Sequence, residues 1–281
     1  MSIKRLFFRL IVRTLEQLTL IRRVRTGSCV NLEETKGSFD VITVAFNNAD
    51  IIPLHCQQVD KYMGEGVTHI IADNSSNKDT SRKIRQYCET NGVPYVRVPK
   101  NYLGLIGGSY SHATALNWVY KRIIQKRKPE FFGFIDHDLF PVRPIHLADL
   151  LRKQHVYGPK RKRGDYWYLS AIMSFFESSY VQDKKVDFMP TRYDNDKSHY
   201  LDTGGSNWMS IYKAMDESDL VFCSERLERF NLGDETGDDR YQDFVELFDG
   251  QWVHTINGSY WKQIDIRKEG MLKDLICRYE S

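Results

Sequence analysis

Two aspartates one residue apart stand at the end of an apolar run in this chain. Asp136 and Asp138 flank His137 and follow residues 131–135, which read Phe-Phe-Gly-Phe-Ile. Side chains alternate along an extended strand, so the two carboxylates are expected to point the same way. Like charges this close repel each other unless a cation lies between them, and carboxylate oxygens are ligands that Mg²⁺ and Mn²⁺ prefer. The pattern therefore suggests a divalent metal site.

A polar loop is the alternative, in which the aspartates cap a turn or a following helix. An Asp-x-Asp pair is weak evidence by itself. The chain holds a second pair, Asp194 and Asp196, in a polar stretch with no strand before it. The elements around Asp136 and Asp138 must therefore decide between the two interpretations.

The composition and the cysteines limit the classes of protein to which this chain can belong. The 281 residues are enough for one large domain, and 41% hydrophobic and 27% charged residues are typical of a globular protein. A net charge of +3 is too small to indicate nucleic acid as a partner. The five cysteines are scattered and form no Cys-x-x-Cys pair, which favours a reducing, cytoplasmic location and argues against a zinc or disulfide framework.

Residues 1–26 form a basic amphipathic segment with no signal-peptide pattern and no apolar stretch long enough to span a bilayer. Seven lysines and arginines stand against Glu16 alone in residues 1–25. We expect a helix that lies on an anionic membrane surface, on its inner face. The alternative is a helix packed on the protein's own body, with its arginines solvated. Its apolar residues at helical spacing are Ile3, Phe7, Leu10, Ile11, Leu18 and Ile21.

From residue 38 onward, apolar runs alternate with helical patterns. Strands are predicted at 40–46, 67–72, 94–98 and 131–135. Helices are predicted after Asp50, which could cap the first of them, at 80–90 and at 110–126, and a shorter one at 145–153. Such alternation indicates a largely parallel, doubly wound sheet with helices on both faces. Residues 27–38 look like a linker before it.

Polar clusters directly follow three of these strands: Phe46–Asn48, Asp73–Ser76 and Asp136–Asp138. Ligands of doubly wound sheets bind beyond the carboxyl ends of the strands, so the clusters are expected to converge on one crevice. Together they favour a nucleotide or phosphate ligand with its metal. The first strand is followed by neither a Gly-x-Gly-x-x-Gly pattern nor a P-loop, which disfavours dinucleotide-binding proteins and ATPases.

In order and spacing, these motifs resemble those of the GT-A-fold nucleotide-sugar glycosyltransferases, of the family-2-like type that builds surface polysaccharides and lipopolysaccharides. The resemblance is specific over residues 40–144, looser to about residue 262, and does not reach the N-terminal helix. It implies a nucleotide-sugar-binding half at 38–144 and an acceptor-binding half with a C-terminal helix at 145–281. It also implies a nucleoside-diphosphate sugar donor, a glycan or lipid-linked acceptor, and Mn²⁺ or Mg²⁺ as cofactor.

Carried over residue by residue, the resemblance implies two groups of site residues. The metal would be held by Asp136, Asp138 and His254. Asp73 would accept a hydrogen bond from the base of the nucleotide, and Asp136 would also reach the ribose. The other donor-binding residues would be Phe46, Asn47, Asn48, Asn74, Ser75, Gly107, Gly108, His112 and Asn117. His254 could instead be a strand histidine bonded to backbone, and His112 is expected to be a polar contact and not a catalyst.

An inverting transferase also needs a carboxylate that takes the proton of the acceptor hydroxyl. In the family this base lies between a Gly-Gly segment and the late histidine, which here selects Asp239 or Asp238, although the usual Glu-Asp pair is replaced by Asp-Asp. Asp202 is the rival, and a loop aspartate that caps a turn is the alternative for all three. The basic run 160–163 could bind a phosphate of the donor or of a lipid-linked acceptor, or be simply solvated.

Two other functions remain open from the sequence. A sugar-phosphate nucleotidyltransferase uses a related sheet and metal, but it usually carries a glycine-rich basic loop after its first strand. A non-catalytic nucleotide- or glycan-binding module would need neither a metal site nor a base.

Overall fold

The structure is a computed structural model that describes residues 3–25, 29–30, 32, 38–194, 196–229, 244–256 and 272–280. Among these residues a seven-stranded sheet runs through the centre, in the order β1-β4-β3-β2-β5-β10-β7. The four central strands are parallel, and β1, β10 and β7 join the edges antiparallel. The strands are β1 (Cys29–Val30), β2 (Phe39–Ala45), β3 (Val67–Asp73), β4 (Tyr95–Arg97), β5 (Phe131–Asp136), β7 (Val156–Tyr157) and β10 (Met173–Glu177).

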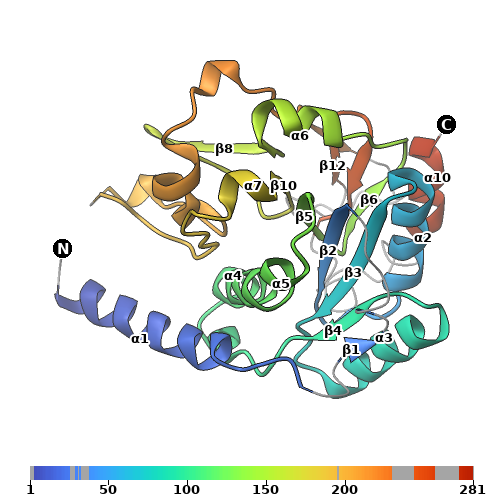
Figure 1. Ribbon diagram of the computed structural model, residues 1–281, viewed down its shortest axis with the longest axis horizontal. Helices are drawn as coiled ribbons and strands as arrows, with labels where there is room; N and C mark the ends of the chain where they lie inside the picture. The colour runs from blue at the N-terminus through green and yellow to red at the C-terminus, as the bar shows by residue number, and fades with distance from the viewer. Residues whose placement is uncertain are drawn as a thin grey trace.

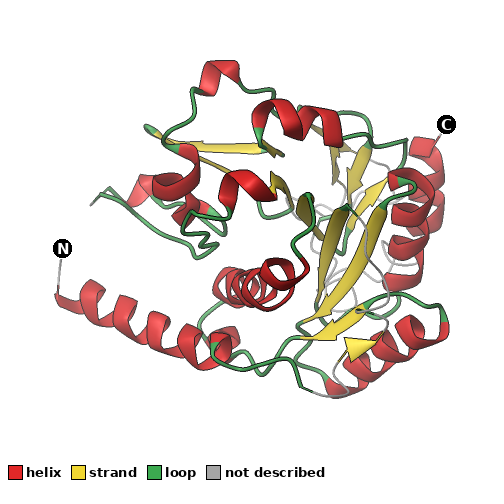
Figure 2. Ribbon diagram, in the orientation of Figure 1, coloured by secondary structure: helices red, strands yellow, loops and turns green. Residues whose placement is uncertain are grey.

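Helices cover both faces of this sheet, as predicted (Figures 1 and 2). Ile42 and Val44 of β2 face the core beneath α4, whereas Ala45 joins the core beneath α2 and α10. This alternation explains why the parallel strands read as continuous apolar runs. The helices are α1 (Ile3–Leu20), α2 (Ile52–Met63), α3 (Lys78–Thr90), α4 (Gly108–Val119), α5 (Gln125–Arg127), α6 (Ala148–Gln154), α7 (Ser178–Val181) and α10 (Leu272–Glu280).

Two smaller β elements complete the described structure. A four-stranded antiparallel sheet has the order β11-β12-β13-β6, and β8 pairs with β9 as a hairpin. Because β6 follows β5 directly, the second sheet begins where the central sheet ends. These strands are β6 (Leu139–Pro141), β8 (Lys160–Arg163), β9 (Tyr166–Leu169), β11 (Glu225–Arg229), β12 (Phe244–Phe248) and β13 (Trp252–His254).

The predicted elements are confirmed, with three corrections. Asp50 is not the cap of α2: the helix begins at Ile52 behind Ile51, with no side-chain cap, and Pro53 lies in its first turn. The helix predicted at 110–126 is α4 and α5 joined by a π-helical turn, η2 (Tyr120–Ile124). The predicted linker contains the short strand β1.

The N-terminal helix α1 packs on the domain through a side that carries both polar and apolar residues. Glu16 and Thr19 are buried with Val12 and Leu20 against the region of α4. Arg13 forms ion pairs with Glu16 at 2.8 Å and with Asp187 at 2.7 Å. The expectation that the arginines of a packed helix are solvated is therefore wrong for Arg13. No described helix is both long enough and apolar enough to cross a bilayer.

Asn117 of α4 joins these buried charges to the chain around residue 188. Its Nδ2 donates to Glu16 Oε1 at 2.7 Å and to Asp187 Oδ1 at 3.2 Å, and its Oδ1 accepts from the Phe188 amide at 2.8 Å. One buried amide therefore satisfies two carboxylates and one backbone N–H. Loss of such a group leaves several buried polar atoms without a partner.

We predict that Asn117→Ala lowers the free energy of unfolding by about 2–4 kcal/mol, because it leaves buried charged acceptors unsatisfied. Urea denaturation measures the change. The control is Asn91→Ala, since the exposed Asn91 side chain donates to the Tyr87 carbonyl at the end of α3 and satisfies no buried charge. Equal stability losses in the two variants would contradict the assigned role of Asn117.

Candidate active site at the carboxyl edge of the sheet

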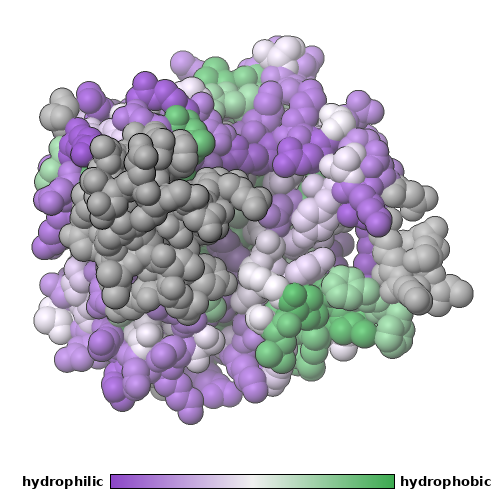
Figure 3. Space-filling model, turned by 180° about the vertical axis from the view of Figure 1, so that it is seen from behind, coloured by the Kyte–Doolittle hydropathy of each residue, from purple (hydrophilic) through white to green (hydrophobic). Residues whose placement is uncertain are grey.

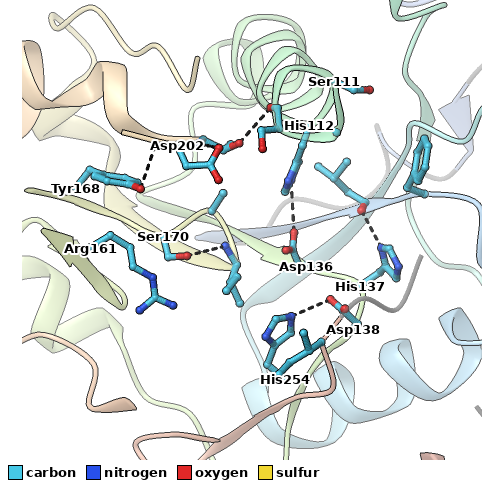
Figure 4. Close-up of a pocket in the computed structure, with 18 of the residues that line it drawn as sticks. Ser111, His112, Asp136, His137, Asp138, Arg161, Tyr168, Ser170, Asp202 and His254 are labelled. Atoms are coloured by element: carbon cyan, nitrogen blue, oxygen red, sulfur yellow. Dashed lines mark hydrogen bonds and ion pairs between the residues drawn. The ribbon is translucent and has the colours of Figure 1, made fainter. Parts of the chain in front are cut away.

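A cavity of about 750 Å³ lies beyond the carboxyl ends of β2 and β5. Its walls come from the two predicted halves of the chain: the start of α4 on one side, and the β8–β9 hairpin with residues 198–203 on the other. Figure 4 shows His112, Asp136, Asp138, Asp202 and His254 around this space. The predicted crevice is thus present at the expected edge of the sheet.

Asp136, Asp138 and His254 meet in this cavity, each offering a ligand atom within 4.8 Å of the others. Asp136 is the last residue of β5, and Asp138 immediately precedes β6. Strand β13 pairs with β6 so that His254 lies opposite Leu139. The Asp138 carbonyl accepts hydrogen bonds from the Thr255 amide and hydroxyl, which fixes this register.

His254 is oriented by a second carboxylate. Its Nδ1 donates to Glu246 Oε2 at 2.5 Å, while its Nε2 lies 3.3 Å from Asp138 Oδ1. With one proton fixed on Nδ1, Nε2 faces a carboxylate, an arrangement that is favourable only when Nε2 also carries a proton or binds a cation together with Asp138. This carboxylate–histidine pairing is the one that orients histidine ligands of metals. The donor set of two carboxylates and one imidazole therefore fits a divalent ion.

The electrostatics of the cluster follow from its burial. Burial raises the pKa of Asp136 to about 7, and the Asp138 charge adds to the shift. Burial by itself would lower the pKa of His254, but Asp138 and Glu246 outweigh it and raise that pKa to about 10. A proton on His254 thus supplies the positive charge that the two aspartates need.

His112 lies beside the cluster, on α4. Its Nε2 is 3.4 Å from Asp136 Oδ1. Burial lowers the pKa of His112 to about 4, although Asp202 and Asp138 oppose the shift. A neutral imidazole at this place can donate one hydrogen bond and agrees with the predicted role of polar contact.

Four of the predicted donor-binding residues besides Asp136 line the cavity: Phe46, Asn74, Gly108 and His112. Asn47, Asn48, Asp73, Ser75 and Gly107 are close in sequence but do not line it. Their roles in binding a nucleotide stay predictions, and the structure gives several of them a different task.

Asp73 is fully buried and its oxygens are occupied by protein donors. Its carboxylate accepts from the Ser75 amide at 2.9 Å and the Tyr95 hydroxyl at 3.0 Å, and Arg97 forms an ion pair with it at 3.1 Å. Ser81 donates to the second oxygen. In this arrangement Asp73 holds the turn after β3 in place.

Asn47 bonds the first polar cluster to the second. It adopts a left-handed backbone conformation, with φ of 51°, and its amide donates to the Ser75 hydroxyl at 3.0 Å. Its side chain donates to the Ser76 hydroxyl and accepts from the Asn77 amide. The two loops after β2 and β3 therefore support each other beside the cavity.

The remaining predicted residues divide into those that line the cavity, those that do not, and those outside the described residues. The structure places Asn117 away from the cavity, in the α1 contact described above, which corrects the expectation that it faces a ribose or diphosphate. Asp202 lines the cavity, and its Oδ1 accepts from the Thr203 amide at 2.8 Å. Asp238 and Asp239 lie outside the described residues. Asp194 and Asp196, the second Asp-x-Asp pair, do not line the cavity and instead interact with His199.

The side chains of the basic run 160–163 alternate between the two faces of strand β8. Lys160 and Lys162 both pair with Glu217, at 2.7 and 3.0 Å. Arg161 and Arg163 line the cavity, and Arg161 also pairs with Glu225. Period-2 alternation in a hairpin is the signal that could have assigned the two arginines to one face.

Glu246, Tyr200 and the hydroxyl of Tyr168 also belong to the site, although the sequence motifs did not indicate them. Tyr168 accepts a hydrogen bond from the Asp202 amide at 3.1 Å, and it lines the cavity together with Tyr200. Glu246 reaches His254 because β12 pairs with β13, with these two residues directly opposite. No local motif marks that pairing.

No protein-family model matches the chain, and no curated protein matches it in sequence.

Solved structures of glycosyltransferases do resemble it. A mannosyltransferase from Pyrobaculum calidifontis, in complex with GDP-Man and Mn²⁺, is 13% identical, with a TM-score of 0.37 over 62% of this chain and 52% of that chain. The galactosyltransferase LgtC, in complex with donor and acceptor sugar analogues, is 14% identical, with a TM-score of 0.35 over 49% of this chain and 57% of that chain. S. aureus TarS 1-349, in complex with UDP-GlcNAc, is 16% identical, with a TM-score of 0.37 over 55% of this chain and 48% of that chain. The match thus spans about half the length of each of these chains.

From the geometry of the cluster we predict that Mn²⁺ binding depends on the Asp136, Asp138 and His254 side chains and also on Glu246. Glu246→Ala removes the group that orients His254 and should weaken Mn²⁺ binding about 10–100-fold, and Asp138→Ala, which removes a ligand, should weaken it at least as much. Isothermal calorimetry with Mn²⁺ measures both effects. Asp196→Ala in the second Asp-x-Asp pair is the matched control and should bind Mn²⁺ like the wild type. If all three variants bind Mn²⁺ equally, this cluster does not hold the metal.

Proposed function

We propose that this protein is a metal-dependent glycosyltransferase, which moves a sugar from a nucleoside-diphosphate donor to a glycan or lipid-linked acceptor. The observation that carries the proposal is the Asp136–Asp138–His254 cluster at the carboxyl edge of a doubly wound sheet, inside one polar cavity. A volume of about 750 Å³ is within the usual range for small-molecule sites and suits a nucleotide sugar. The motif order at residues 40–144 supports the same class.

Mn²⁺ or Mg²⁺ is the proposed cofactor, with Asp136, Asp138 and His254 as its protein ligands. Bound there, the ion would neutralise the charge that develops on the diphosphate leaving group. The protein supplies the position: Glu246 fixes the ring of His254, and the Thr255 bonds to Asp138 fix the turn between β5 and β6. His112, as a neutral imidazole, could donate a hydrogen bond to an oxygen of the nucleotide sugar beside Asp136.

Asp202 is the proposed base among the described residues. Its carboxylate points into the cavity across from Asp136 (Figure 4), and one of its oxygens is held by the Thr203 amide. The second oxygen is available to take the proton of an acceptor hydroxyl. Asp239 and Asp238 stay predictions for this role, because they lie outside the described residues.

The division of labour between the halves is also a proposal. Residues 38–144 supply the loops after β2 and β3 and the start of α4, which suits a donor site. Residues 145–281 supply the β8–β9 hairpin, Tyr168, Tyr200 and Asp202, which suits an acceptor site. Synthesis of a surface polysaccharide or lipopolysaccharide is the process that this proposal favours.

The reaction products distinguish the proposal from its rivals. Incubation with a panel of nucleotide sugars and Mn²⁺ should release nucleoside diphosphate slowly, since water replaces the acceptor. Release of pyrophosphate from a nucleoside triphosphate and a sugar phosphate would identify a nucleotidyltransferase. Binding of a nucleotide sugar without either product would support a binding module.

We predict that Asp202→Asn lowers sugar transfer about 10²–10⁴-fold, the usual effect of losing a general base, while donor affinity stays near that of the wild type. The measurement is transfer rate, with donor affinity from calorimetry. Asp239→Asn is tested in parallel. Wild-type transfer by Asp202→Asn together with loss in Asp239→Asn would assign the base to Asp239.

A further inference from the structure

Helix α1 presents a row of apolar side chains to solvent, whereas its inward side is mixed, with Val12 and Leu20 buried beside Glu16. Arg13 and Glu16 point inward, as described above, and Arg9 donates to the Arg192 carbonyl at 2.6 Å. The outward side of a helix on the surface of a globular protein normally carries polar and charged residues, so the exposed apolar row of α1 is unusual. The large apolar side chains exposed on or directly after α1 are Leu6, Phe7, Phe8, Leu10, Ile11, Leu18 and Ile21, of which Phe7, Leu10 and Ile21 are more than 60% exposed.

Phe7, Leu10 and Ile11, Leu18 and Ile21 are spaced so that one helical face carries all five: Leu10 and Ile11 lie three and four residues after Phe7, and Leu18 lies seven after Ile11 and three before Ile21. We call this row the α1 apolar face. Figure 3 shows a continuous hydrophobic patch where α1 runs along the surface. A row of this size needs a partner, because isolated exposed apolar residues are common but a contiguous patch marks an interaction site.

Helix α1 packs against two elements that contribute residues to the cavity wall, η1 (Tyr102–Leu105) and α4. The turn η1 packs on α1, and Arg22 donates to the Tyr102 hydroxyl at 2.8 Å. Leu105 at the end of this turn is 94% exposed, whereas its neighbour Gly104 lines the cavity. Phe8 contacts Tyr110 edge-on, two residues beyond Gly108 of the cavity wall. A partner bound to this face would therefore lie beside the cavity.

Charge selects the kind of partner. Seven basic residues and one acidic residue occupy positions 1–25, and the acidic one, Glu16, is buried and paired with Arg13. Arg13 and Arg9 are directed to the protein itself, so the charge that selects a partner comes from the other basic residues. Arg23 and Arg25 are exposed just beyond the helix. A second copy packed on the same face would bring two basic segments together and repel. An anionic lipid surface attracts them instead.

We propose that the α1 apolar face and Leu105 insert into the interface of an anionic membrane, and that the acceptor is a lipid-linked molecule taken from that membrane. The first part rests on the helix alone. The second part rests on the proposed function and on the position of Leu105 next to the cavity. The predicted location on the inner face of a membrane would follow from this contact.

Vesicle sedimentation of the full chain tests the proposal. Wild-type protein should sediment with vesicles of phosphatidylcholine and phosphatidylglycerol and much less with phosphatidylcholine alone, and binding should weaken as salt rises. Leu10→Ser with Leu18→Ser should lower binding at least about tenfold, because two inserted apolar side chains are lost. Leu105→Ser should lower it less. Removal of all of residues 1–25 is a poor test, because it would uncover Asn117 and Asp187.

Val221→Ser with Leu227→Ser is the matched control, since these two side chains are exposed to a similar degree but lie away from α1: Leu227 is on β11, and Val221 is in the segment before it. It should bind vesicles like the wild type. Failure of the wild type to bind anionic vesicles, or equal loss in the control, would overturn the proposal. So would a dimer in sedimentation velocity that Leu10→Ser with Leu18→Ser dissociates, because a second copy would then cover the face.

Donor hydrolysis without vesicles separates this proposal from the proposed function. All of these variants should hydrolyse the donor at the wild-type rate, because none of the changed residues lines the cavity. Vesicle binding without any hydrolysis would leave the membrane contact intact and refute the glycosyltransferase.

Discussion

The close approach of Asp136 and Asp138 in a largely buried edge is the constraint on which the rest of the site depends. Two carboxylates removed from water repel each other and lose hydration, so the fold must bring positive charge to them. Here His254 arrives on a strand from more than a hundred residues further along the chain. His254 pairs with Glu246, and the Arg161 side chain lies 4.0 Å from Glu246. Negative and positive groups therefore alternate from the aspartates to the cavity wall. A cluster with this balance is prepared for a divalent cation, which can replace the proton of His254.

The polar loops around the cluster form a rigid support. Asn47, Ser75 and Asp73 use their polar atoms on one another and on Arg97, so the loops after β2 and β3 are held together without a ligand. Asn74 continues this support to α4 by donating to the Ser111 hydroxyl at 3.2 Å. The cavity wall is therefore preorganised, which lowers the cost of ordering side chains when a ligand binds.

In helix α1, a buried polar network determines which side chains are exposed on the surface. Asp187 and Asn117 require partners, and Arg13 and Glu16 provide them from the inward side of the helix. The helical period then places Phe7, Leu10 and Leu18 outward. Packing on the body and contact with a membrane, which were alternatives for the sequence, are compatible in one helix because they use opposite faces.

The sequence by itself determined the central sheet and the place of the Asp136–Asp138 pair at its carboxyl edge. Apolar runs with helical segments between them specify parallel strands, and the carboxyl ends of such strands must lie at one edge, so Asp136, Asp138, Phe46 and Asn74 were correctly assigned to the cavity. Local spacing also revealed the amphipathic pattern of α1. These features depend on short-range periodicity, which is visible in the residues themselves.

Only the tertiary structure decided which polar groups face the cavity and which serve the fold. Asn117 and Asp73 carry side chains suited to a ligand, but neighbours distant in sequence, Glu16 and Arg97 among them, consume their hydrogen bonds. Glu246 reaches His254 through a strand register, and the outward direction of the α1 apolar face follows from ion pairs to Asp187. Such contacts join residues up to 174 positions apart, and their energies depend on burial that no local pattern specifies.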